Sequence, residues 1–211
     1  MDPLIVHDPN VRSCFEELRS AGLSDDVLVD VILRGEASRD SATLHDPPSR
    51  AGFDAYADAV RALRDLLVPE GWEADNTKNV CTVVAPDRTQ AVAAMSGGRG
   101  VGQPDVTPQP KYPRGPAMTY AVVPNQLALF EDNVMPLIRG PRLWFLLVYR
   151  EPGTDVVLAE LSMPEAISES GRVTSWLCRY LLPPIDVDPT PTRAGHDDEP
   201  DDSIDVPVSR K

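Results

Sequence analysis

Residues 143–149 read Leu-Trp-Phe-Leu-Leu-Val-Tyr, a continuous run of large apolar side chains. Seven residues are far too few for a membrane-spanning helix, which needs about 20. Aromatic and β-branched side chains favour a strand, and a strand without polar alternation is buried on both faces. The stretch therefore predicts a buried strand over residues 143–150.

Further strands are predicted on both sides of this one, over residues 80–85, 89–95, 156–162 and 173–182. The first two flank Pro86-Asp87-Arg88, which has the composition of a tight turn and predicts a hairpin. Pro152-Gly153-Thr154 turns the chain from the buried strand into the next one. The last strand alternates, with apolar side chains on one side at Trp176, Cys178, Tyr180 and Leu182.

Residues 10–68 predict helices. Asn10 and Ser24 are suitable N-caps for two short helices, which end at Gly22 and Gly35. The pair has the outline of a helix-turn-helix, but the acidic start of the second helix favours a plain helical hairpin. Ser49 caps a third helix over residues 50–68, with an apolar stripe at Phe53, Tyr56, Ala57, Val60, Leu63 and Leu67.

These elements predict an α+β fold in two layers, with an antiparallel sheet of about five strands packed against the N-terminal helices. Residues 1–185 are expected to form a single domain, with helices over 10–68 and strands over 80–95 and 143–182. Residues 96–141 predict a long Pro- and Gly-rich loop. Residues 186–211 are rich in Pro and Asp and predict a disordered acidic tail.

The formal net charge is −13 and the sequence pI is about 4.6. Direct, sequence-specific contact with nucleic acid is not expected, because each phosphate contact requires a cation, and the same holds for anionic membranes. Cys14, Cys81 and Cys178 are widely spaced and form neither a disulfide framework nor a zinc motif, so a reducing cytoplasm is expected. No secretory signal is visible, and no cofactor is expected.

Late in the predicted loop the chain reads Gln126-Leu127-Ala128-Leu129-Phe130, after Pro124 and Asn125. This stretch resembles the pentapeptide by which many bacterial proteins dock on the DNA sliding clamp. The resemblance covers five residues and implies a partner. It assigns the anchoring amide to Gln126 and the apolar contacts to Leu127, Leu129 and Phe130, while Ala128 faces solvent.

A clamp-docking peptide predicts a non-enzymatic accessory protein in DNA replication, DNA repair or mobile-element biology. The alternative is that Leu127, Leu129 and Phe130 belong to a buried stripe of the core. The chain is then a small-ligand-binding or enzymatic α+β domain, with a pocket between the long helix and the sheet, around Trp72, Trp144 and Trp176. A third possibility is a structural subunit that uses the same apolar loop to contact another protein.

Four other patterns give weaker signals. The glycine-rich residues 97–102 follow a strand but lack the Gly-Lys-Ser/Thr end of a P-loop, so they indicate either a phosphate cradle or a flexible exit. Lys111, Tyr112 and Arg114 form a basic-aromatic spot that contacts nucleic acid or keeps the loop soluble. Asp155 and Glu160 lack the lysine of a nuclease motif and are interpreted as hairpin surface charges. The histidines, at positions 7, 45 and 196, share no metal-ligand spacing.

Overall fold

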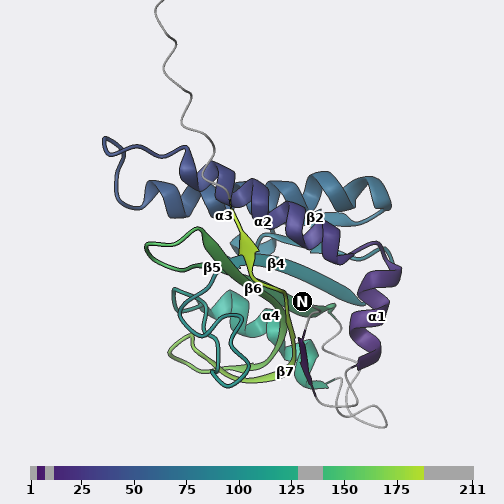
Figure 1. The fold of residues 1–211 in the computed structure, drawn as a ribbon. Coiled ribbons are helices and arrows are strands. Elements are labelled where there is room, and N and C mark those ends of the chain that lie inside the picture. The colour runs from purple at the N-terminus through teal and green to yellow at the C-terminus, as the bar shows by residue number, and fades with distance from the viewer. Residues whose placement is uncertain (1–3, 8–11, 128–139, 188–211) are drawn as a thin grey trace, which may run out of the picture.

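A computed structural model describes residues 4–7, 12–127 and 140–187 of the chain (Figure 1). The helices are α1 (Arg12–Ser20), α2 (Asp25–Asp40), α3 (Arg50–Leu67) and α4 (Pro116–Leu127). The strands are β1 (Leu4–His7), β2 (Glu73–Asp75), β3 (Thr82–Val84), β4 (Gln90–Ser96), β5 (Arg142–Arg150), β6 (Val156–Ile167), β7 (Val173–Leu181) and β8 (Ile185–Asp186). Two single 3-10 turns lie at Val68–Glu70 and Thr77–Asn79.

The α+β class is confirmed, but the sheet is mixed and not purely antiparallel. Its strands lie in the order β1-β7-β6-β5-β4-β3-β2, and β8 pairs with Val156 and Val157 at the start of β6. The pairing of β4 with β5 is parallel, with Ser96 opposite Val148, and the other pairings are antiparallel. A parallel pair requires a crossover connection, and residues 97–141 supply it. The short strands β1 and β2 lie at the two edges of this path and were not predicted.

Both faces of the sheet are covered, which makes three layers where two were predicted. α2 and α3 lie over one face and α4 over the other (Figure 1). The run predicted to be buried on both faces is the core of β5, and this prediction is confirmed. Trp144 and Leu146 pack with the N-terminal helices, while Phe145 and Leu147 pack with Met118 and Val122 of α4.

α4 lies within residues 96–141, where a loop was predicted. Pro116 occupies its first position, where no backbone N–H is needed, and Pro124 lies inside it. Asn125 is completely buried: its amide nitrogen donates to the carbonyls of Leu143 (2.9 Å) and Pro164 (2.7 Å), and its oxygen accepts from the Leu143 N–H (2.7 Å). These tertiary hydrogen bonds hold the helix in place, although the prolines locally favour a loop.

The N-terminal helices follow the predictions in part. The Ser24 cap of α2 is confirmed by a hydrogen bond from Val27 N (3.3 Å), and α3 begins at Arg50 as predicted. Ser49 makes no side-chain cap bond, and Phe53, expected in the apolar stripe, is 64% exposed. None of the described helices is long and apolar enough to cross a membrane.

α2 continues through Gly35 to Asp40, so the predicted stop at this glycine is wrong. Gly35 lies where α2 meets α3, and a Cβ at this position would be 2.9 Å from the carbonyl oxygen of Ala55. The glycine therefore permits close helix packing. The predicted acidic tail also begins too early, because Asp186 ends β8 and Val187 is buried, while residues 188–211 lie outside the described residues.

Replacing Gly35 with alanine is expected to lower the free energy of unfolding by about 1–3 kcal/mol, because the added methyl group meets backbone atoms of α3. Gly52→Ala is the matched control: it also lies in a helix, but its added Cβ has no neighbour within 4 Å. This control should be neutral or stabilise by up to about 1 kcal/mol. Urea denaturation measures both. Equal effects of the two substitutions would contradict the close packing at Gly35.

Candidate functional site

A cleft of about 710 Å³ lies at the C-terminal ends of the parallel strands β4 and β5. Its walls come from the first turn of α3, from the residues that follow β4, from residues 111–114 and from the end of β5. Adjacent parallel strands end at the same edge of a sheet, and their connections separate there. In α/β proteins this edge is the usual place for a ligand.

The glycine-rich wall of the cleft is held by backbone hydrogen bonds. Gly97 N donates to Val148 O (2.7 Å), Gly98 N to Gln109 O (2.8 Å), and Lys111 N to Ser96 O (2.9 Å). A Cβ on Gly97 would be 2.5 Å from the Val101 side chain. The segment is therefore a fixed part of the fold, and the expectation of a flexible exit from the sheet is wrong.

A buried ion pair fixes the continuation of this wall. Glu160 of β6 and Arg179 of β7 are joined by two hydrogen bonds of 2.6 and 3.1 Å, and both side chains are buried. Glu160 also accepts from Gly102 N (2.9 Å) and from Ser162 Oγ (2.7 Å). Arg179 donates its remaining N–H groups to the carbonyl oxygens of Gln103, Pro104 and Val106. Residues 102–106 are thus attached to the sheet.

Arg114 is positioned by the turn between β6 and β7. Its backbone N–H donates to Gly171 O (2.8 Å), and a Cβ on Gly171 would be 2.3 Å from the Arg114 carbonyl oxygen. The guanidinium is largely buried, and its Nε has no hydrogen-bond partner among the described residues. Burial lowers the pKa of Arg114 because desolvation disfavours the charged form, although an arginine stays protonated at neutral pH.

The cleft is positively charged in an acidic chain. Five basic residues line it, and the described lining residues include no aspartate or glutamate. The basic residues are Arg39, Arg99, Lys111, Arg114 and Arg150.

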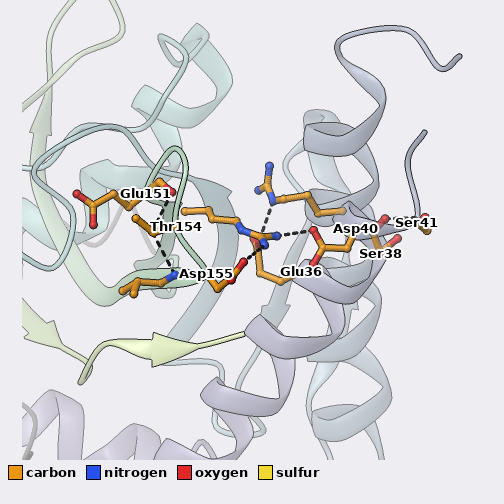
Figure 2. A network of polar contacts seen from close by, with 10 residues as sticks. Glu36, Ser38, Asp40, Ser41, Glu151, Thr154 and Asp155 are labelled. Atoms are coloured by element: carbon orange, nitrogen blue, oxygen red, sulfur yellow. Dashed lines mark hydrogen bonds and ion pairs between the residues drawn. The ribbon is translucent and has the colours of Figure 1, made fainter. Parts of the chain in front are cut away.

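Two of these cations are neutralised by carboxylates outside the cleft. Figure 2 shows Glu36 and Asp40 of α2 on one side and Asp155 of the β5–β6 turn on the other, with dashed lines that converge between them. Arg150 pairs with all three, at 3.5 Å from Glu36 and 3.2 Å from Asp155, and Arg39 pairs with Glu36 at 2.7 Å. In contrast, the structure gives no ion pair to Arg99, Lys111 or Arg114 within the part of the chain that it describes.

Aromatic rings border the same cleft. Phe53 of α3 and Tyr112 are 64% and 60% exposed, and Lys111 Nζ lies 5.6 Å from the centroid of the Tyr112 ring. Tyr56 also lines the cleft and is hydrogen-bonded to Cys81. Burial, and then this hydrogen bond, raise the pKa of Tyr56. Cations and exposed rings therefore lie together, as an anion with an aromatic group would require.

The structure describes only some of the other predicted site residues. Gln126 and Leu127 are the last residues of α4, and Leu129 and Phe130 lie outside the described residues. The prediction that Trp72, Trp144 and Trp176 surround one pocket between the long helix and the sheet is wrong, because the first two are buried with the N-terminal helices and the third packs on the opposite face of the sheet.

The interpretation of Asp155 and Glu160 as surface charges is wrong for Glu160, which is fully buried. Asp155 is an exposed partner of Arg150, so the two carboxylates have separate structural roles. Across the described residues no cluster of His, Cys, Asp and Glu is arranged to hold a metal ion.

Sequence reasoning identified Lys111, Tyr112, Arg114 and the glycine-rich segment, but not that they share a cleft. It missed Phe53, which the helical periodicity assigns to the core, and Arg150, which follows a buried strand. An exposed aromatic residue at the first turn of a helix is visible only once the helix is placed on the sheet.

Arg179→Met is expected to lower the free energy of unfolding by about 3–5 kcal/mol, because it leaves the Glu160 carboxylate buried without a counter-ion. The double substitution Glu160→Gln/Arg179→Met should be less destabilising than the single one, since it also removes the unpaired charge. Urea denaturation of the wild type, Glu160→Gln, Arg179→Met and the double variant measures the free energy of unfolding of each. A double variant that is as unstable as the sum of its single variants would contradict the coupling.

Comparison with known proteins adds no family to these observations: no protein-family model, no curated protein and no solved structure matches the chain.

Proposed function

We propose that this protein binds a small anionic ligand in the cleft at the ends of β4 and β5. The observation that carries the proposal is Arg114, a largely buried cation with no carboxylate partner among the described residues and with a buried, unpaired Nε. Burying an uncompensated charge costs free energy. An anion that pairs with the guanidinium recovers this cost. Anion binding therefore accounts for an arginine that is buried without a carboxylate partner.

The rest of the cleft supports an anion as well. Arg99 and Lys111 add positive charge, and the first turn of α3 presents the positive end of a helix dipole. The volume of about 710 Å³ lies within the range of about 300–1,000 Å³ that is common for small-molecule sites. A small ligand is favoured over a polymer, because the net charge of −13 repels an extended polyanion.

Binding, and not catalysis, is proposed. The described residues that line the cleft include no His, Cys, Asp or Glu, which are the usual general acids, bases and strong nucleophiles. The serines of the lining, Ser49 and Ser96, have no such base beside them in the same lining.

Arg114→Met is expected to weaken the binding of inorganic phosphate or sulfate by about 10- to 100-fold, the loss typical of one charge-assisted hydrogen-bonding group. Thermal stability should stay the same or rise, because the substitution removes the desolvation cost. Isothermal titration calorimetry at low ionic strength measures binding, and a melting curve measures stability.

The control for this experiment is Arg61→Met on α3, where the arginine is 72% exposed and pairs with Asp58. It should bind the anion like the wild type. A wild type that binds neither phosphate nor sulfate, or an Arg114→Met variant with unchanged affinity, would refute the proposed function.

A second candidate function is docking on the bacterial DNA sliding clamp through Gln126, Leu127, Leu129 and Phe130. The buried Asn125 supports it, because its hydrogen bonds to β5 and β6 hold the backbone firmly just before the motif. A rigid support lowers the entropy cost of presenting a short peptide. The protein would then act in the cytoplasm as an accessory factor in DNA replication, DNA repair or mobile-element biology, with its localisation supplied by the clamp.

For this second candidate, titration of a purified bacterial sliding clamp should show saturable binding with a Kd on the order of micromolar. Leu129→Ala/Phe130→Ala should abolish it, because the two largest apolar contacts are lost. Ala128→Ser changes the position assigned to solvent and should leave binding intact. Circular dichroism checks folding. Absence of wild-type binding refutes the docking function, and unfolding of the double variant would place both side chains in the core.

A further inference from the structure

Anion binding alone does not account for the exposed rings at the cleft. Phe53 and Tyr112 are among the few large apolar side chains in the described residues that are more than half exposed, and both line this cleft. Exposing a ring to water forgoes the stabilisation that its burial would provide. A ligand that covers the two rings would recover it.

Both rings line the cleft that contains the cations, and one of them contacts a cation directly. Tyr112 lies between Lys111 and Arg114 in the sequence, and the Lys111 ammonium approaches the Tyr112 ring at 5.6 Å. Phe53 belongs to the first turn of α3, whose N-terminus borders the same space. One compact ligand is therefore able to contact a ring, a cation and a helix N-terminus together.

We infer that the ligand is a nucleoside monophosphate, with its phosphate bound by Arg114 and Lys111 and its base stacked on Phe53 or Tyr112. This inference rests on the proposed function and adds the aromatic part of the ligand. Stacking on an aromatic side chain is favourable for every base, so the structure assigns the class of ligand and not a particular base.

A mononucleotide fits the surroundings better than a nucleic acid strand. The carboxylates of Glu36, Asp40 and Asp155 lie just behind the basic residues at one end of the cleft. They neutralise Arg39 and Arg150 and leave positive charge only around Arg99, Lys111 and Arg114. This small region suits a single phosphate group, whereas a strand needs a basic track along its backbone.

The test is calorimetric titration of the full chain with adenosine 5′-monophosphate, ribose 5-phosphate, adenosine and inorganic phosphate. Adenosine 5′-monophosphate should bind about tenfold more tightly than ribose 5-phosphate, the gain expected from stacking one base. Adenosine should bind weakly because it lacks the phosphate. The other three nucleoside monophosphates should bind within about tenfold of the adenine nucleotide, since stacking tolerates every base.

Phe53→Ala/Tyr112→Ala should abolish the difference in affinity between adenosine 5′-monophosphate and ribose 5-phosphate, because only the nucleotide has a base to stack. Both side chains are exposed, so the fold should tolerate their loss, and Phe53→Leu/Tyr112→Leu repeats the test with larger apolar side chains. The matched control is Tyr120→Ala, an aromatic residue of α4 that is 69% exposed and lies outside this cleft.

The outcomes separate this inference from the proposed function. Equal affinities for adenosine 5′-monophosphate and ribose 5-phosphate would overturn the inference and leave anion binding standing. Failure of all four ligands, inorganic phosphate included, would overturn both. Much tighter binding of an eight-residue thymidine oligonucleotide than of any mononucleotide would overturn the inference in favour of a polymer.

Discussion

One buried ion pair, between Glu160 and Arg179, holds to the sheet the connection from which one wall of the cleft is formed. Each partner is saturated: the carboxylate accepts from Arg179, Ser162 and Gly102, and all five N–H groups of the guanidinium have acceptors. A buried pair is tolerated when the remaining hydrogen-bonding groups of both ions are satisfied. Here the partners on both sides include backbone groups of residues 102–106, so the pair joins β6 and β7 to the crossover connection. The path of that connection then determines where the glycines and Arg99 lie.

Two arginines of the cleft show how differently one residue type is used. Arg150 pairs with three carboxylates and ties α2 to the end of β5, a role in holding the fold together. Arg114 is fixed through its backbone by Gly171, yet its side chain has no such carboxylate among the described residues. A protein that bears the cost of an uncompensated cation gives up stability at that point, as binding sites commonly do. The contrast between the two arginines, and not the number of basic residues, marks the end of the cleft at which we propose that an anion binds.

The sequence predicts the elements well where local periodicity governs them, and poorly where distant contacts decide. β5 and α3 follow directly from their apolar patterns, and the Pro86-Asp87-Arg88 hairpin follows from its turn composition. The helix α4 is held by Asn125, whose partners lie 18 and 39 residues away, and the parallel pairing of β4 with β5 joins strands on either side of the crossover. No local pattern contains either contact. Lys111, Tyr112 and Arg114 stand out by composition, but Phe53 joins them only through the placement of α3. The Glu160–Arg179 pair spans two strands and is equally invisible in the sequence.

The crossover between β4 and β5 also affects the order in which the parts of this protein form during synthesis. The cleft combines residues near positions 53, 98, 112 and 149, and two of its walls are fastened by Gly171 and Arg179, which are made later. Contacts between residues so far apart in the chain form slowly, and N-terminal parts emerge first from the ribosome. The helical layer of α2 and α3 can pack early, because its contacts are local. The cleft is therefore one of the last features to form, and a nascent chain that ends before β7 has the lining residues without the hydrogen bonds from Arg179 that hold residues 103–106.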